Sequence, residues 1–343
     1  MKFLSCPQLE PFLTKVTNHA EAIDRDFKVL KSTYQEFCDL GYHTCGTPPC
    51  RLIGGSEDWF EWMTLVAKAS GSLAWLAIQQ YAANPYVANL DFGDEWPTIG
   101  GAYGHLRAGR PDRSPQWNGD TMSGLIPWYS GAHIFEKIMM GFFLPDGTEA
   151  YALVDGKSTP NFTFSEPKSM IGCDSTANVS ITLTDFPLSE DQILCTGAFG
   201  TRKSEDDSGV LNQVPLSLGV CFRALELIVS NDRIELKKRI ALEDTVNDLY
   251  ARIVNEAQQN CHQEKRHALR AEATELSLKL SRIAIMSSMP AGISPESTGS
   301  RLMREATFFA CVGGQNQVID CAIDRITQTK PASAMKLQAA ISA

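Results

Sequence analysis

A short stretch in the middle of the chain, Gly124 to Gly131, combines side chains that suit a flat ligand. Trp128 offers a large rigid aromatic surface, and Ser130 carries a hydroxyl that both donates and accepts hydrogen bonds. Tyr129 stands between them. These residues can form the wall and the polar edge of a slot for a planar ring. The structural alternative is a core tryptophan in a sheet, followed by a turn serine.

A second candidate is the loop from Thr98 to Arg107, which has the sequence TIGGAYGHLR. Thr98 and His105 supply its polar side chains. We therefore treat both as candidate contacts to a cofactor or substrate. For His105 the alternative is a loop histidine satisfied by its own neighbours.

The ten cysteines are spread over the whole chain, and most have apolar neighbours. This pattern is typical of buried thiols in a reducing compartment, so we expect a cytoplasmic protein. Cys45 and Cys50 lie close to His43, which is the one grouping of metal-ligand types. Zinc sites usually combine two such short pairs, and no second pair exists here. We predict no metal site.

The chain has 343 residues and a formal net charge of −9. An acidic chain without a basic tract argues against binding to nucleic acid or to an anionic membrane. No window approaches the roughly 20 uninterrupted apolar residues of a membrane span. The N-terminus has one lysine, a very short apolar run and an early proline, which does not fit a signal peptide.

Three regions differ in sequence character, and together they predict an α+β protein. Residues 1–94 are expected to be helical, with one helix over Ala20–Gly41 and a buried pair over Asp58–Tyr81 that is broken near Gly71. Residues 95–204 carry short β-branched runs between turns and predict a small antiparallel β-domain. Residues 205–343 predict a bundle of four helices with short connections. The segments expected to be its helices are 209–231, 235–262, 266–287 and 300–326.

This order resembles the acyl-CoA dehydrogenase superfamily, and two stretches carry the resemblance. Gly124–Gly131 is similar to the family's Gly-x-Lys-x-Trp-Ile-Thr/Ser pattern at the flavin edge. By this resemblance, Trp128 matches the aromatic residue against the isoalloxazine and Ser130 the hydroxyl residue near flavin N5. Ser300–Ala306 is similar to the family's Arg-x-x-Arg-Asp helix. The resemblance implies FAD as the cofactor, with Tyr129, Thr98 and His105 also in the cofactor site.

The sequence departs from the family at the position of the catalytic base and in the nucleotide-binding motifs. Most members take the substrate α-proton with a glutamate that follows the Arg-x-x-Arg-Asp helix, and Gly313 aligns with that glutamate. Some members supply the base from the first bundle helix, where Gly209 aligns. The family's nucleotide-binding motifs are also altered, because the first segment, RIELKKRIALEDTVND, has no Phe-Gly and the second, SSMPAGISPESTGS, has no Gly-Gly pair.

We therefore expect a divergent flavin-dependent oxidoreductase with altered chemistry. It would oxidise or oxygenate a thioester-linked or small organic substrate, and it would be a homo-oligomer. Catalytic residues are not assigned. The alternatives are a fold member without redox activity that binds or cyclises a substrate, and a non-catalytic partner subunit.

Overall fold

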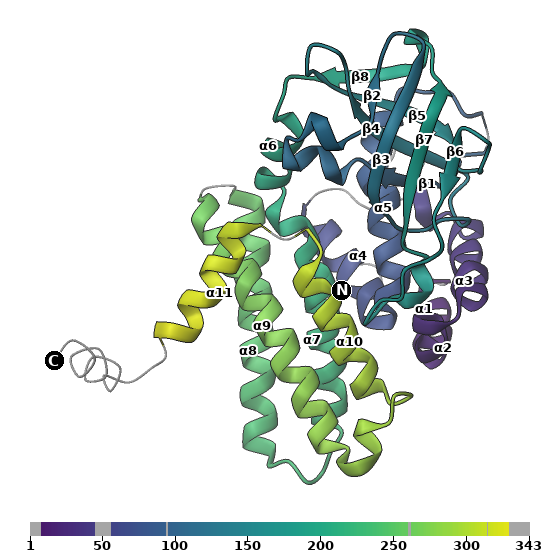
Figure 1. Cartoon of the computed structure of the whole chain (residues 1–343). Helices are drawn as coiled ribbons and strands as arrows, with labels where there is room; N and C mark the ends of the chain where they lie inside the picture. Colours follow the sequence, from purple (N-terminus) through teal and green to yellow (C-terminus); the bar gives the residue numbers. More distant parts are fainter. Residues whose placement is uncertain (1–7, 45–55, 94, 260–261, 314, 329–343) are drawn as a thin grey trace, which may run out of the picture.

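The computed structural model describes residues 8–44, 56–93, 95–259, 262–313 and 315–328, and it has the three predicted parts (Figure 1). A β-domain lies at one end of the molecule, the N-terminal helices lie beside and below it, and a helical bundle forms the other end. The helices are α1 (Leu9–Asn18), α2 (Ala20–Arg25), α3 (Phe27–Asp39), α4 (Ser56–Ala69), α5 (Gly71–Val87), α6 (Thr201–Ser208), α7 (Val214–Val229), α8 (Leu236–Gln259), α9 (Gln263–Ser287), α10 (Thr298–Cys311) and α11 (Asn316–Gln328).

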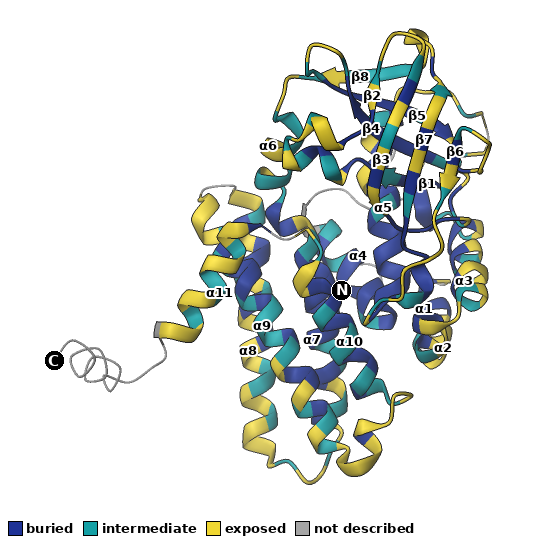
Figure 2. Ribbon diagram, viewed as in Figure 1, coloured by how far each residue is buried: buried dark blue, intermediate teal, exposed yellow. Residues whose placement is uncertain are grey.

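The N-terminal helices follow the apolar pattern with one exception. The helix expected over Ala20–Gly41 is two helices, α2 and α3, because Asp26 leaves the helical conformation. Its carboxylate accepts hydrogen bonds from the backbone N–H groups of Lys28 and Val29 and so caps α3. The break predicted near Gly71 is present, with Ser70 as the N-cap of α5. Both α4 and α5 are largely buried (Figure 2).

The β-domain holds one sheet of eight strands rather than a purely antiparallel one. The strands are β1 (Ile99–Ala102), β2 (Gln116–Trp117), β3 (Thr121–Tyr129), β4 (Lys137–Phe143), β5 (Glu149–Asp155), β6 (Phe162–Phe164), β7 (Val179–Pro187) and β8 (Ile193–Gly197). The order is β6-β7-β3-β2-β4-β5-β8, with β1 paired to β4. The expected hairpin joins β4 and β5, but β1 and β2 both run parallel to β4. The expectation of a wholly antiparallel sheet was wrong because these strands are too short to reveal their partners.

The bundle consists of α7, α8, α9 and α10, with α7 at its centre (Figure 1). Helix α7 packs closely against α4, because a Cβ atom on Gly219 would lie 2.6 Å from the backbone of Ala67. The segment Val210–Val229 is long and apolar enough to cross a membrane by length and composition, but 61% of that window is buried inside the protein. Packing within the core therefore accounts for its apolar character.

Helix α10 is joined to the N-terminal helices by a buried charged cluster. Arg301 and Glu305, both fully buried, are paired at 2.7 Å, and Glu305 also accepts the backbone N–H of Gly71. Arg304 binds Asp24 at 2.6 Å. These residues come from the stretch whose sequence resembles the Arg-x-x-Arg-Asp helix. In this chain they fix α10 against α2 and α5.

The prediction of a single last helix over residues 300–326 is wrong. It ends at Cys311, and α11 begins at Asn316. Gly313 lies between them with a φ of +57°, a left-handed conformation that favours glycine and ends the helical path. At the other end of the bundle region, α6 crosses the boundary expected between residues 204 and 205.

Candidate functional site

Trp128 lies on the exposed face of the sheet, at the end of β3. The register between β3 and β7 shifts between Ile126 and Tyr129, so the chain carries one irregular step there. Ile126 and Tyr129 both remain buried, whereas Trp128 between them is 41% exposed. A bulge of this kind re-aims a side chain. Here it places the indole of Trp128 on the exposed side of the strand, whereas strict alternation would have placed it on the buried side with Ile126.

A lysine covers this indole. The Nζ atom of Lys168 lies 5.3 Å from the centre of the Trp128 ring and donates a hydrogen bond to the carbonyl oxygen of Pro127. A cation over an indole face is stabilised by the ring quadrupole. The pair therefore combines a flat aromatic surface with a positive charge over one of its faces.

Tyr129, the last residue of β3, and Ser130, which follows it, are both buried. The hydroxyl of Ser130 accepts a hydrogen bond from Trp75 Nε1 at 3.0 Å and donates to Asn178 Oδ1. Tyr129 stacks on Phe164, and burial raises its pKa. These contacts anchor the end of β3 to α5 and β7. Because the Ser130 proton is already donated to Asn178, contact between this hydroxyl and flavin N5 stays a prediction.

Thr98 is also engaged within the protein. Its backbone N–H donates to a carboxylate oxygen of Glu136, and its hydroxyl accepts the backbone N–H of that residue. This exchange fixes the start of β1 beside β4. Contact between Thr98 and a cofactor stays a prediction.

His105 lies in the turn Gly104–Ala108, and both of its ring nitrogens are enclosed without a well-formed hydrogen bond. Burial lowers its pKa to about 4, and the neighbouring backbone of Gly141 opposes that shift. The ring is therefore neutral near pH 7. An enclosed imidazole with unsatisfied nitrogens is compatible with a polar contact to a ligand, which stays a prediction.

The turn at Gly313 is the position that the sequence aligns with the dehydrogenases' base, and an amide occupies the space beside it. A Cβ atom on Gly313 would lie 2.5 Å from Gln213 Nε2. Gln213, just before α7, accepts a hydrogen bond from Arg270 of α9 at 2.9 Å. Arg270 also donates to the carbonyl oxygen of Val312 at 2.7 Å, and Arg107 donates to that of Gly313 at 3.4 Å. The described side chains that contact this turn are therefore an amide and two guanidinium groups.

Hydrogen bonds of Gln315 also hold the end of this turn that leads into α11. Gln315 is buried, its Oε1 lies 2.8 Å from His267 Nε2, and its Nε2 donates to the carbonyl oxygen of Asp206. The turn between α10 and α11 is thus tied to α9 on one side and to α6 on the other. These contacts preform the site around Gly313.

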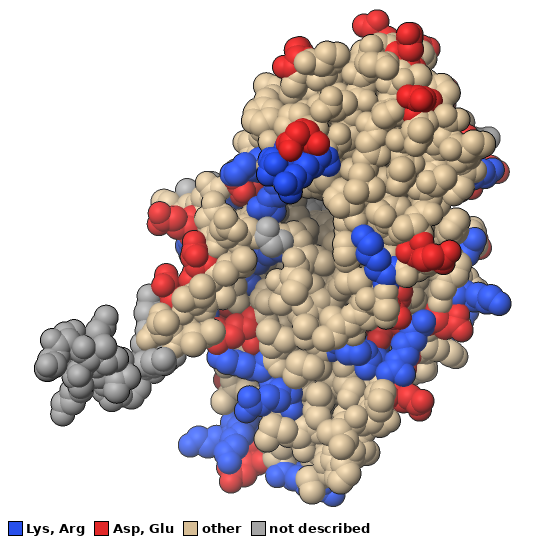
Figure 3. Space-filling view, in the orientation of Figure 1, with Lys and Arg blue, Asp and Glu red and all other residues tan. Residues whose placement is uncertain are grey.

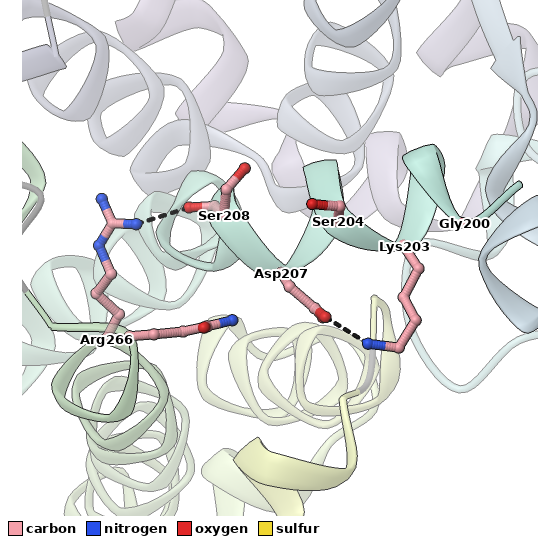
Figure 4. A pocket seen from close by; sticks show the side chains of 7 residues that line it. Gly200, Lys203, Ser204, Asp207, Ser208 and Arg266 are labelled. Atoms are coloured by element: carbon pink, nitrogen blue, oxygen red, sulfur yellow. Dashed lines mark hydrogen bonds and ion pairs between the residues drawn. The ribbon is translucent and has the colours of Figure 1, made fainter. Parts of the chain in front are cut away.

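A cavity of about 520 Å³ opens between α6 and the start of α9 (Figure 4). Its lining is polar and consists of Gly200, Lys203, Ser204, Asp207, Ser208, Gln263 and Arg266. Figure 4 shows Lys203 paired with Asp207 and Arg266 bonded to the backbone of Ser208. The other carboxylate oxygen of Asp207 lies 3.8 Å from Arg107. The cavity therefore adjoins the arginines at the turn.

The surface is hollowed between the β-domain and the bundle, and Lys and Arg atoms lie at the rim of the hollow (Figure 3). Within the described residues no group of three or more His, Cys, Asp or Glu could hold a metal ion. Cys45 and Cys50 of the grouping noted in the sequence lie outside the described residues. His43 is described, and its Nε2 lies 3.0 Å from the carbonyl oxygen of Trp96.

Solved structures share this architecture across nearly the whole chain. Butyryl-CoA dehydrogenase from Megasphaera elsdenii superposes with a TM-score of 0.72 at 14% identity, over 95% of this chain and all of that one. The chain has the acyl-CoA dehydrogenase fold. The nitrososynthase from Micromonospora carbonacea var. africana shares the fold with a TM-score of 0.72 at 14% identity, over 93% of this chain and 94% of that one. No protein-family model matches the chain, and no curated protein sequence matches it.

A third similar structure is KijD3 in complex with FMN and a dTDP-linked amino keto sugar, with a TM-score of 0.71 at 14% identity, over 95% of this chain and 93% of that one. The acyl-CoA dehydrogenase fold thus carries both a dehydrogenase and a flavin-bound protein with a different ligand. The predicted fold is confirmed.

Sequence reasoning missed three residues of this region, Lys168, Arg107 and Arg270. Arg107 closes the loop whose His105 was selected, and its charge was a signal that could have been used. Arg270 interrupts an apolar helical pattern and is only 6% exposed. A charged residue on the buried face of a helix indicates either an ion pair or a site. Lys168 gave no local signal, because the indole it covers is far away in sequence.

Proposed function

We propose that this protein is a flavin-dependent oxidoreductase that binds FAD in the hollow between the β-domain and the bundle. The observation that carries the proposal is Trp128, an exposed indole at the domain edge with the Lys168 ammonium over its ring. A flat apolar wall and a nearby donor are what an isoalloxazine ring requires. Trp128 would support the ring, Lys168 would place positive charge at its edge, and Tyr129, Ser130 and Thr98 would hold that wall in place.

The bound flavin would supply hydride or electron transfer, and this chain's residues limit what accompanies it. Among the described residues, the side chains that contact the turn at Gly313 are amides and guanidinium groups, with no carboxylate to remove an α-proton. Ordinary acyl-CoA dehydrogenation is therefore not favoured. We propose oxidation of a small or thioester-linked organic substrate that brings its own acidic proton, or oxygenation.

The purified protein tests this proposal directly. We expect a yellow protein, or one that turns yellow with added FAD, with flavin absorbance bands. Trp128→Ala should weaken flavin binding at least about tenfold because the ring loses its stacking surface. Trp128→Phe should retain most of the affinity. Leu125→Ala, another exposed residue on the same strand, is the matched control.

A colourless protein that no added FAD or FMN changes would refute the proposal. Equal flavin affinity of Trp128→Ala and the parent would refute the placement of the ring against Trp128. Titrating FAD and FMN side by side also tests the cofactor identity. FAD is expected to bind more tightly if the adenine half is recognised despite the altered nucleotide motifs.

A second candidate function is a fold member that binds or shapes a substrate without redox work. The missing carboxylate at Gly313 favours it, and a colourless but ligand-binding protein would support it. A non-catalytic partner subunit would instead copurify with a related chain that retains the glutamate.

We also propose that the protein is a cytoplasmic homo-oligomer. Ile319, Ile323 and Ile326 of α11 are each more than half exposed and form one apolar stripe on that helix. Mass measured by light scattering, with Ile323→Glu as the disrupting variant, tests the association.

A further inference from the structure

We propose that Arg107 and Arg270 form an anion-binding site at the turn between α10 and α11, and that this site takes a carboxylate of the substrate. The inference rests on the proposed function, since it places the carboxylate in the same hollow as the flavin. It adds the chemical class of the substrate, which the resemblance does not supply.

Arg270 is buried without a carboxylate partner. It makes three hydrogen bonds, and all of them go to neutral oxygens, those of Val210, Gln213 and Val312. No described carboxylate forms an ion pair with it within 4 Å. Burial, aided by the positive charge of Arg107, lowers its pKa to about 10. A buried cation normally has an anionic partner, so this guanidinium is incompletely compensated.

Arg107 approaches the same turn from the β-domain. Its only described hydrogen bond is the long one to Gly313 O at 3.4 Å, and its ion pair with Asp207 is loose at 3.8 Å. A guanidinium has five N–H donors, so most of those on Arg107 are unused, as are two of those on Arg270. Two cations that flank consecutive carbonyl groups leave donors for an oxyanion between the domains.

The surrounding carboxylates compensate the charge of this pair only in part. Asp206 and Asp207 are the nearby carboxylates, and they are engaged by Arg202 and Lys203 of the same helix. Arg266 adds a further cation at the wall of the adjoining cavity. A local excess of positive charge on a protein of net charge −9 indicates a site selected for an anion. Planar, bidentate guanidinium donors match a carboxylate in particular.

The cavity of about 520 Å³ lies next to this site. Asp207 is in the cavity wall (Figure 4), and one of its carboxylate oxygens lies 3.8 Å from the guanidinium of Arg107. The proposal therefore predicts that Arg107 selects the anion and that Arg270 both binds it and holds the turn.

Titration calorimetry and thermal-shift titration with butyrate and its neutral isostere butyramide test the site. The parent protein should bind butyrate at least about tenfold more tightly than butyramide. Arg107→Gln should remove that preference, and Arg107→Lys should keep part of it. Arg113→Gln, an exposed arginine in the neighbouring turn, removes the same charge and should change nothing. Arg270→Gln can disturb the turn, so Arg107 carries the test.

Equal binding of butyrate and butyramide would overturn the proposal, as would equal losses in the Arg107 and Arg113 variants. Tighter, Arg107-dependent binding of inorganic phosphate than of butyrate would also overturn it, because the site would then recognise phosphate. Flavin content is measured separately. A colourless protein with Arg107-dependent butyrate binding would refute the flavin proposal alone, and a yellow protein without that preference would refute the carboxylate site alone.

Discussion

Replacing Gly313 with glutamate is the substitution that the family resemblance suggests, and the structure predicts that it fails. Gly313 has a φ of +57°, and a Cβ atom there would lie 2.5 Å from Gln213 Nε2 and 2.7 Å from its Cδ. Gln213 must therefore move, and it then loses the hydrogen bond from Arg270. The aligned position exists in this chain, but its space is already filled.

The expected loss in the free energy of unfolding of Gly313→Glu has two contributions. A non-glycine residue in the left-handed region costs about 1–2 kcal/mol. A hydrogen bond to a charged group is worth about 1.5–3 kcal/mol. Attraction between the introduced carboxylate and Arg270 would offset part of this loss of stability, so we expect a net destabilisation of about 3 kcal/mol. In a chain of this length that lowers the melting temperature by about 4 °C.

Two further variants separate the contributions in a thermal-unfolding assay. Gly147→Glu is the matched control, because Gly147 has a φ of +84° with nothing within 4 Å of a Cβ atom, so only the backbone cost applies. Gln213→Ala combined with Gly313→Glu makes room for the carboxylate and should recover stability beyond the sum of the single effects. Turnover of butyryl-CoA with an artificial electron acceptor should be absent in Gly313→Glu and is expected, if anywhere, in the flavin-bound double variant.

Wild-type stability of Gly313→Glu would refute this reasoning, and so would a drop no larger than that of Gly147→Glu. Strict additivity in the double variant would show that Gln213 is not the obstacle.

Three other predictions follow from buried polar groups. The pKa of His105 is about 4 in the folded protein and about 6.5 in the unfolded chain, so protonation destabilises the fold by up to about 3 kcal/mol as the pH falls from 6.5 to 4. His105→Leu should therefore reduce the fall in melting temperature across that pH range. An unchanged slope would contradict this prediction. Ser130→Ala leaves Asn178 without its donor and should lower stability by about 1–3 kcal/mol in denaturant unfolding, whereas no loss would show that the anchor is dispensable. Glu305→Gln leaves the Arg301 guanidinium buried without its closest partner and should cost about 3–5 kcal/mol in the same assay, with a cost below about 1 kcal/mol as the contrary result.

The sequence predicted the fold where one local signal dominates and failed where partners are distant. Apolar periodicity located α4 and α5, and a Pro-Asp-Gly turn located the hairpin of β4 and β5. The same periodicity continued through Asp26, because a cap interrupts the backbone without interrupting the apolar stripe. The parallel pairing of β1 with β4 depends on a crossover that no local pattern encodes.

The candidate site shows the same division. The indole of Trp128 was found from its residue type and context, but its exposure depends on a register shift between β3 and β7 that sequence does not reveal. Ser130 was selected for a hydroxyl that can donate and accept hydrogen bonds, yet Trp75, 55 residues away, accounts for one of its bonds. Residue type therefore selected the candidate region, and long-range contacts decide which of its side chains remain available to a ligand.

The charge at the turn between α10 and α11 gives these observations a common consequence. A carboxylate at this position would repel an anionic substrate group and attract a proton, whereas guanidinium groups do the reverse. Arg107 and Arg270 approach the turn from the β-domain and from the bundle, so an anion bound between them would also join the two parts. Under the proposed function, a glycine at the position of the base and the presence of the arginines would be one change of chemistry rather than two. The chain would keep the wall at Trp128 and exchange proton abstraction for the binding of negative charge.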